Sequence, residues 1–190
     1  MIDFSRQFVV ACFLVFIAVW IVTAFSAKRT VERAGFPWVG VAVVAGFVVF
    51  AIHRLNIGRA QAGGGIIWDS APLPALIGDA LTLAGLLIML WARFTLGGNW
   101  SAQVEFKENH ELIERGPYAY VRHPIYSGAV LMVLGAAILS GRIVPFEVLV
   151  LLVIAFVFKS GQEEALLTKH FPEAYPKYKA RVKTFIPSVF

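Results

Sequence analysis

Long runs of residues without charge are the feature that most restricts how this chain can fold. The longest are residues 8–25, residues 36–52 and residues 73–92, the last interrupted only by Asp79. At a rise of about 1.5 Å per residue, each approaches the roughly 17 to 25 residues with which a helix crosses a hydrocarbon layer about 30 Å thick. Of the 190 residues, 58% are hydrophobic and 15% are charged, a balance more apolar than that of soluble domains. The sequence therefore predicts an integral membrane protein.

Two shorter apolar segments follow later in the chain. They cover residues 125–139 and residues 143–158 and are joined by Ser140, Gly141 and Arg142. Each is of marginal length for a full crossing, so we interpret them as a tight transmembrane hairpin, with partial re-entrance left open. The predicted fold class is all-α, with about five transmembrane helices, the last two forming this hairpin.

The distribution of Lys and Arg predicts the orientation. With five crossings, one side of the membrane holds only four of the 17 basic residues, Arg6, Arg54, Arg59 and Arg142. Cytoplasmic flanks carry the excess, so we expect the N-terminus outside and the C-terminus in the cytosol. The net charge of +5 suits anionic lipid headgroups and requires no nucleic acid, and nothing indicates an obligatory protein partner. The single cysteine, Cys12, excludes a disulfide within the chain, and we expect no metal.

The chain divides by chemistry near residue 93. Residues 1–92 hold three predicted transmembrane helices with few polar groups, whereas residues 93–190 hold the hairpin, a C-terminal tail and almost every residue that could do chemistry. The second region is therefore the predicted catalytic region, on the cytosolic side. Asp79 is an acid inside a span and hence a functional candidate. It also lies near the outer start of its helix, where it can reach headgroups or water, and both interpretations stay open.

The stretch GPYAYVRHPIYSG, residues 116–128, leads into the hairpin. Pro124 restricts His123 to an extended backbone and suits the first position of a helix, so Arg122 and His123 directly precede a helix N-terminus. Unpaired N–H groups and the helix dipole favour an anion there, and two cationic side chains are unfavourable unless an anion lies between them. The alternative is that both side chains extend to phosphate headgroups.

The segment after Phe158 continues the last helix beyond its hydrophobic part. Glu163 and Glu164 lie about one turn further on, and adjacent helical residues point about 100° apart, so one can face inward while the other faces solvent. A plain charged helix end is the alternative. Further on, three apolar residues are spaced by three and four positions, Tyr175, Tyr178 and Val182. This spacing predicts a short amphipathic helix face that could cover the same site. Pro176 predicts that this helix is preceded by a break or starts late.

These motifs together resemble one superfamily. An R-H-P-x-Y-x-G segment enters a hydrophobic hairpin, E-E follows on the next helix, and a Tyr-rich basic tail ends in proline. This order is similar to that of the isoprenylcysteine carboxyl methyltransferases and phospholipid methyltransferases, which are integral membrane enzymes. The resemblance covers residues 96–187, and LGGNWSAQVEFKENHELIERGPYAYVRHPIYSG is particularly similar to the carboxyl methyltransferase branch.

The resemblance implies S-adenosylmethionine as the methyl donor and in-line transfer to a lipophilic acceptor, such as the carboxylate of a prenylated cysteine. It implies that Arg181 holds the acceptor carboxylate and that Asn99 and Trp100 line the entrance. The implied cofactor-binding residues are Tyr118, Arg122, His123, Pro124, Tyr126, Gly128, Glu163 and Glu164.

Two other functions are compatible with parts of the pattern. Membrane sterol-type reductases, which use a nicotinamide cofactor, have a similar proline- and tyrosine-containing segment near a C-terminal hairpin, but they are generally longer. A non-enzymatic membrane scaffold is the other alternative, and it should show no saturable binding of S-adenosylmethionine. The sequence does not identify the acceptor, nor whether oxygen, nitrogen or sulfur is methylated.

Overall fold

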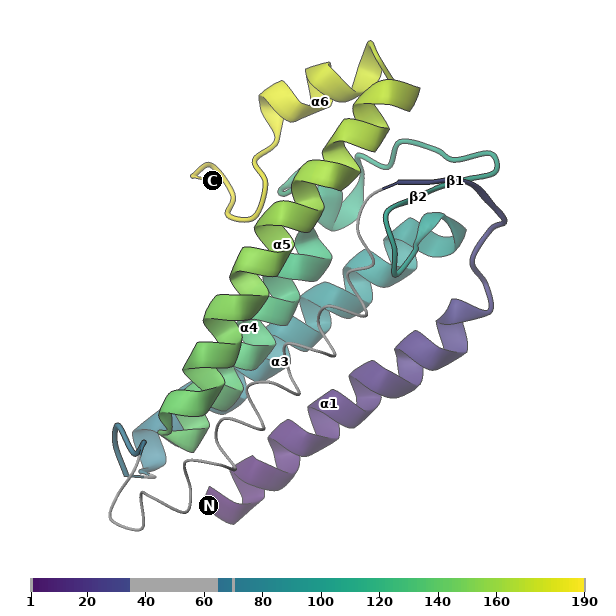
Figure 1. The fold of residues 1–190 in the computed structure, drawn as a ribbon. Coiled ribbons are helices and arrows are strands. Elements are labelled where there is room, and N and C mark those ends of the chain that lie inside the picture. The colour runs from purple at the N-terminus through teal and green to yellow at the C-terminus, as the bar shows by residue number, and fades with distance from the viewer. Residues whose placement is uncertain (1, 35–64, 70, 190) are drawn as a thin grey trace.

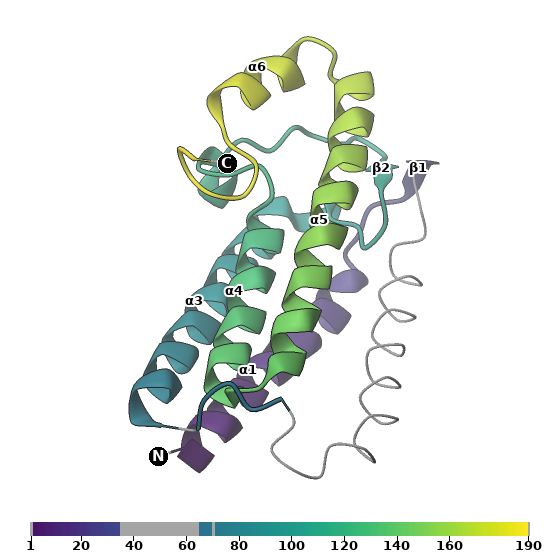
Figure 2. The same cartoon turned by 60° about the vertical axis from the view of Figure 1, so that its left-hand side comes forward.

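The described part of the chain is a bundle of long helices with its polar segments gathered at one end. The computed structural model describes residues 2–34, 65–69 and 71–189. Helices α1 (Ile2–Ala24), α3 (Pro72–Leu96), α4 (Pro124–Ser140) and α5 (Ile143–His170) run side by side (Figures 1 and 2). The remaining elements are short and lie at the end of the bundle that is uppermost in Figure 1. They are β1 (Thr30–Arg33), η1 (Gly97–Asn99), β2 (Glu105–Lys107), η2 (Gly116–Ala119) and α6 (Ala174–Arg181).

The helices lie where four of the five apolar runs predict them. Ile2–Ala24, Pro72–Asn99 and Ile143–His170 are long and apolar enough to cross a membrane, and Pro124–Ser140 is a shorter apolar helix. The predicted run at residues 36–52 lies outside the described residues. Helix α5 continues 12 residues past Phe158 to His170, which confirms the predicted polar extension of the last helix.

Glycines hold α3 and α4 in close contact. A Cβ added at Gly128 would lie 2.7 Å from the Gly85 carbonyl oxygen and 2.6 Å from Met89 Cγ. A Cβ at Gly78 would lie 2.7 Å from the Gly135 carbonyl oxygen. Small residues at helix interfaces let backbones approach closely in membranes, where apolar side chains gain little by leaving lipid. The α3–α4 pair is therefore the most tightly packed part of the bundle.

Polar contacts at both ends of α3 attach it to α1. Near the start of α3, the Ser5 hydroxyl donates to Asp79 Oδ2 at 2.7 Å. Near its end, Arg93 is only 1% exposed and donates to the carbonyl oxygens of Thr23 at 2.5 Å and Gly97 at 2.8 Å. These carbonyls belong to the C-terminal ends of two helices, where the dipole favours a cation. The buried charge of Arg93 is thus placed where helix ends stabilise it.

A two-stranded antiparallel sheet orders the polar end. Strands β1 and β2 come from distant parts of the chain, and the buried Glu105 carboxylate joins them. It lies 2.6 Å from Arg33 Nη2 and 2.7 Å from Lys107 Nζ, and it accepts the Ser101 hydroxyl at 2.6 Å. Burial alone would raise the pKa of Glu105, but hydrogen bonds, that of Lys107 foremost, lower it to about 2. The loop between η1 and β2 is therefore fixed to the segment that follows α1.

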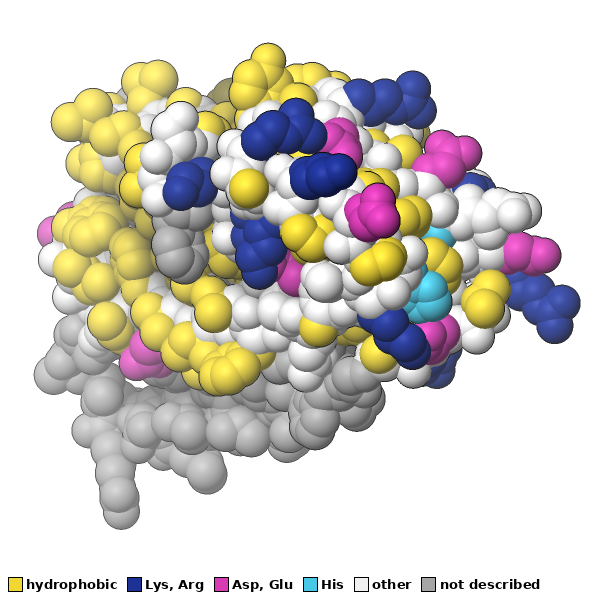
Figure 3. Space-filling model, turned by 90° about the horizontal axis from the view of Figure 1, so that it is seen from above, with side chains coloured by type: hydrophobic (Ala, Val, Ile, Leu, Met, Phe, Trp, Pro, Cys, Tyr) yellow, Lys and Arg dark blue, Asp and Glu magenta, His cyan; other side chains and the backbone are white. Residues whose placement is uncertain are grey.

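The tail folds back over the start of α4. Helix α6 begins at Ala174, so the predicted break precedes it and Pro176 lies in its first turn, where a missing N–H is tolerated. The predicted face of Tyr175, Tyr178 and Val182 is buried in one cluster. Seen from this end, Figure 3 shows Lys and Arg side chains gathered here, whereas hydrophobic side chains cover much of the flank.

Candidate active site

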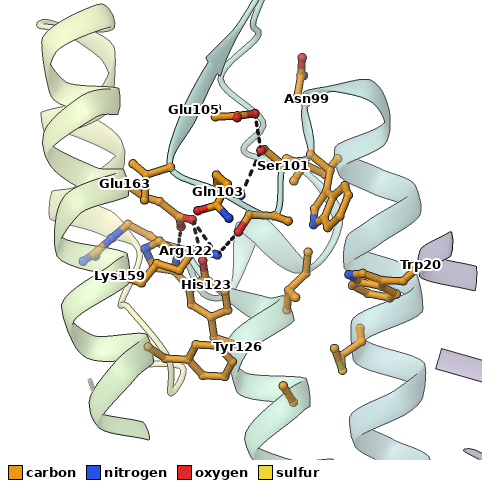
Figure 4. A pocket seen from close by; sticks show the side chains of 18 of the residues that line it. Trp20, Asn99, Ser101, Gln103, Glu105, Arg122, His123, Tyr126, Lys159 and Glu163 are labelled. Carbon is orange, nitrogen blue, oxygen red and sulfur yellow. Dashed lines mark hydrogen bonds and ion pairs between the residues drawn. The ribbon is translucent and has the colours of Figure 1, made fainter. Parts of the chain in front are cut away.

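A cavity of about 500 Å³ lies between the four long helices and the loop before β2. At the polar end of the bundle, ionisable and amide side chains line it (Figure 4). Deeper along the helices its walls are apolar. The polar lining residues are Asn99, Ser101, Gln103, Glu105, His110, Arg122, His123, Lys159 and Glu163, and the deeper ones include Phe13, Phe16, Met89, Ala129, Met132, Leu152 and Phe156. One space therefore offers both a polar and an apolar compartment.

The start of α4 and the residue before it supply two aromatic side chains to the cavity. Pro124 starts the helix, which places His123 just before it and Tyr126 one turn further, so that their rings stack with centroids 5.3 Å apart. The Tyr126 hydroxyl donates to Glu163 Oε1 at 2.6 Å, and Lys159 Nζ lies 3.7 Å from the same oxygen. Lys159 also lies 5.3 Å from the Tyr126 ring centroid. These contacts hold Glu163 in a defined position on the cavity wall.

The two adjacent glutamates point in different directions, but the prediction that one of them faces solvent is wrong, because Glu164 is only 7% exposed. Glu163 lines the cavity, whereas Glu164 is buried against Arg122, whose Nη2 lies 2.8 Å from Glu164 Oε1. Glu164 Oε1 also lies 3.3 Å from His123 Nε2, and Glu164 Oε2 lies 2.7 Å from Lys179 Nζ. The anion next to Arg122 and His123 is thus a carboxylate of the protein itself, Glu164, where the sequence left open a bound anion or lipid headgroups.

His123 lies between both carboxylates. Its Nδ1 is 3.5 Å from Glu163 Oε2, and its Nε2 faces Glu164. Burial alone would lower the pKa of the imidazole, but hydrogen bonds with Glu163 and Glu164 outweigh this effect and raise the pKa. His123 is therefore biased towards the charged form while it is paired with the two glutamates.

Seven of the predicted site residues line the cavity. They are Asn99, Trp100, Tyr118, Arg122, His123, Tyr126 and Glu163. The other four lie elsewhere: Pro124 is buried at the start of α4, Gly128 packs against α3, Glu164 faces Arg122, and Arg181 is exposed with its Nη2 2.6 Å from Glu114 Oε2. The functional roles assigned to all eleven remain predictions.

Several cavity residues were not predicted from the sequence. Lys159 is the first charged residue after the last apolar run and precedes Glu163 by four positions, a spacing that places both on one helix face. Ser101, Gln103 and Glu105 alternate with apolar residues, a pattern that indicates one polar face of an extended segment. No local signal identifies Trp20, because its place on the wall depends on how α1 packs.

The sequence of this chain is similar to those of known proteins. Residues 74–174, more than half of the chain, match the family described as Phospholipid methyltransferase. Protein-S-isoprenylcysteine O-methyltransferase of Rattus norvegicus is 33% identical over 119 residues, which cover 57% of this chain and 42% of that protein. The protein of the same name from Schizosaccharomyces pombe is 36% identical over 98 residues, which cover 49% of this chain and 41% of that protein. These matches thus span less than half the length of either relative.

A solved structure is also similar. It is that of a eukaryotic intramembrane Ras methyltransferase, isoprenylcysteine carboxyl methyltransferase, which matches with a TM-score of 0.53 and 26% sequence identity. The match covers 82% of this chain and 54% of the other. The fold is thus that of an integral membrane protein of the methyltransferase class. The chain belongs to the phospholipid methyltransferase family, in the superfamily that includes the isoprenylcysteine carboxyl methyltransferases.

Proposed function

We propose that this protein transfers a methyl group from S-adenosylmethionine to a lipophilic acceptor, such as the carboxylate of a prenylated cysteine. The observation that carries the proposal is the single cavity with a polar compartment beside an apolar one. A polar cofactor and a lipid-like acceptor need these two environments next to each other. The names of the curated relatives support the choice of a carboxylate on a prenylated cysteine.

The polar compartment fits the proposed cofactor. Glu163, fixed by Tyr126, can accept hydrogen bonds from a ribose diol or an ammonium group. Lys159 can attract a carboxylate, as can His123 when it is protonated, and Tyr118 and Trp100 offer aromatic faces beside an adenine. When bound, S-adenosylmethionine would supply a methyl group on a sulfonium, which is an excellent leaving group. No covalent nucleophile is then needed from the protein.

The protein contributes position and exclusion of water. The apolar side chains of α1, α4 and α5 would hold the hydrophobic part of the acceptor and remove water from its reactive oxygen. Holding donor and acceptor in one geometry makes the reaction effectively unimolecular, which accounts for much of the acceleration in such transfers. Phe13, Phe16 and Trp20 take part, so this site draws on residues 1–92 as well as on the predicted catalytic region.

The proposed topology places the polar end in the cytosol. In a Cys12→Ala background, Asp69→Cys and Lys177→Cys should be labelled from opposite faces of intact membranes, since three helices separate them. This orientation follows the Lys and Arg asymmetry and would give a water-soluble cofactor direct access. Labelling of both positions from one face would contradict the three crossings, and labelling of Lys177→Cys from the outer face would contradict the orientation.

The decisive experiment joins binding and transfer on one preparation. Reconstituted protein is titrated with S-adenosylmethionine by calorimetry and then given methyl-labelled cofactor with a synthetic farnesylated cysteine acid or with its amide. We expect saturable binding and base-labile label on the acid only. Binding of a nicotinamide dinucleotide in place of S-adenosylmethionine would favour a reductase, and binding of neither would favour a scaffold.

A further inference from the structure

The C-terminal tail forms a strap across the start of α4. The strap comprises residues 182–185, and the N–H groups of Arg122 and His123 donate to the carbonyl oxygens of Lys183 at 2.8 Å and Thr184 at 3.0 Å. The Ser127 hydroxyl donates to the Phe185 carbonyl oxygen at 2.7 Å. N–H groups at a helix start have no partner within the helix, and the strap supplies acceptors there. The position of the strap is therefore coupled to the backbone at the site.

The strap also holds two side chains of the site. The Arg122 guanidinium donates to Thr184 Oγ1 at 2.9 Å and to the Val182 carbonyl oxygen. The Phe185 ring lies with its centroid 5.9 Å from that of His123. If the strap moved away, Arg122 would lose two acceptors and His123 would lose an aromatic neighbour. Arg122 would then be held less firmly, and so would its contact with Glu164.

The tail on both sides of the strap, residues 177–189, exposes basic and apolar side chains. Four exposed cations lie here, Lys177, Lys179, Arg181 and Lys183. Lys179 and Arg181 are paired with Glu164 and Glu114, whereas Lys177 and Lys183 have no acidic partner among the described residues. Beyond the strap, Ile186 is 53% exposed and Val189 is 72% exposed. Figures 1 and 2 show the chain descending from α6 towards the bundle, so this end lies near the level at which α4 begins.

This composition matches a segment that lies on a membrane surface. Exposed cations attract anionic headgroups, and neighbouring apolar side chains enter the boundary between headgroups and acyl chains. We infer that residues 177–189 bind the anionic lipid surface of the surrounding membrane, and that this contact holds the strap against the start of α4. Anionic lipid then sets the geometry of the site. The effect on the cofactor rests on the proposed function, whereas the lipid contact itself does not.

A fluorescence experiment tests the lipid contact directly. In a Cys12→Ala background, Val189→Cys carries an environment-sensitive dye, and the protein is reconstituted in phosphatidylcholine with or without phosphatidylglycerol. Quenching by lipids that are spin-labelled near the headgroup should be strong with phosphatidylglycerol and weaker without it. Lys177→Gln combined with Lys183→Gln should reduce the difference, since each lysine near an anionic surface contributes roughly fivefold to association.

The matched control removes two exposed cations outside the tail. Arg29→Gln combined with Arg115→Gln lowers the net charge equally and should leave the quenching unchanged. Equal loss of quenching in both double variants would overturn the inference, because net charge alone would explain it. Quenching that is independent of phosphatidylglycerol would also overturn it. So would release of the dye from the quencher by soluble glycerophosphate, because that would indicate a phosphate site and not a surface.

Cofactor affinity in the same preparations tests the coupling. Phosphatidylglycerol should strengthen binding of S-adenosylmethionine severalfold in the native tail and by much less in the Lys177→Gln, Lys183→Gln variant. Equal affinity in both lipids, with quenching as expected, would refute the coupling of lipid to the site. Absence of cofactor binding in every lipid would refute the proposed function and leave the quenching result standing.

Discussion

Glu163 and Glu164 are adjacent in sequence, but their substitution should have different consequences. Glu164 Oε1 accepts from Arg122 Nε at 2.9 Å and lies 2.8 Å from Arg122 Nη2, and the Arg122 side chain is only 7% exposed. Glu164→Gln therefore leaves a buried guanidinium without its counter-charge. Removal of one partner of a buried pair costs about 3 to 5 kcal/mol. Because the amide keeps one acceptor oxygen, we expect a loss of about 2 to 4 kcal/mol in the free energy of unfolding.

Glu163→Gln should instead act on the cofactor. Glu163 faces the cavity, and its amide can still accept from Tyr126, so stability should change by less than about 1 kcal/mol. A lost charged hydrogen bond to the cofactor should weaken binding by about 1.5 to 3 kcal/mol, which is roughly 10- to 150-fold. The two variants thus separate a residue that binds from one that supports the fold.

Two measurements on the same purified variants decide the matter. For a chain of this size, Glu164→Gln should lower the apparent melting temperature by roughly 5 to 15 °C, whereas Glu163→Gln should leave it nearly unchanged. Arg122→Gln added to Glu164→Gln should restore part of the stability, since both buried charges are then gone. Native-like cofactor affinity in Glu163→Gln, together with a lowered melting temperature, would contradict the role assigned to Glu163.

Three further changes test other parts of the structure. Gly128→Ala should destabilise the protein by about 1 to 3 kcal/mol because its Cβ would collide with the Gly85 backbone, whereas Gly161→Ala, with open space around it, is the matched control; equal melting temperatures would refute the packing argument. Arg181→Lys should keep the fold and cofactor affinity but lower turnover roughly tenfold to a thousandfold if the planar guanidinium orients the acceptor, and full turnover would end that assignment. The native protein should lose stability as the pH falls from about 4.5 towards 2, because Glu105 has a pKa of about 2 in the folded state and its charge stabilises the fold fully only above this range. Glu105→Gln should lose less stability over the same pH range. Parallel curves of stability against pH for the two proteins would show that Glu105 is not the cause.

The long helices were predictable because membranes impose a simple rule on sequence. A helix that crosses lipid must satisfy its own backbone and present apolar side chains, so charge-free runs predict its position directly. The tight turn of the hairpin was also predicted, since Ser140, Gly141 and Arg142 join the two apolar runs, but the register was not. Tyr126 and Phe156, which are equally far from Gly141 in the sequence, stack with ring centroids 4.3 Å apart. The run that starts at residue 73 predicted the start of α3 at Pro72, whereas α1 starts at Ile2, before the run that begins at residue 8, because its first turns carry polar residues.

The cavity residues were predictable only in part. His123, Tyr126 and Glu163 lie in motifs that combine charge with an apolar context, so the sequence draws attention to them. Trp20 lies on α1 in a run of similar apolar residues, and only helix packing decides which of them faces the cavity. The pairing of β1 with β2 is equally hidden, because more than 70 residues separate the partners and neither strand exceeds four residues.

Arg93 and Arg122 show that the direction of a helix decides how a buried cation can be stabilised. Arg93 lies at the C-terminal end of α3, where the dipole is negative, and two carbonyl oxygens of helix ends suffice as its partners. Arg122 lies at the N-terminal end of α4, where the dipole is positive, so a carboxylate must come from another element. Glu164 on α5 supplies it, and only an antiparallel hairpin of this length brings α5 to that height beside Arg122. The spacing between the R-H-P and E-E motifs therefore has to place Glu164 beside Arg122. A helical turn inserted into either arm of the hairpin should separate the two side chains and disrupt the site, even though every residue of the site is retained.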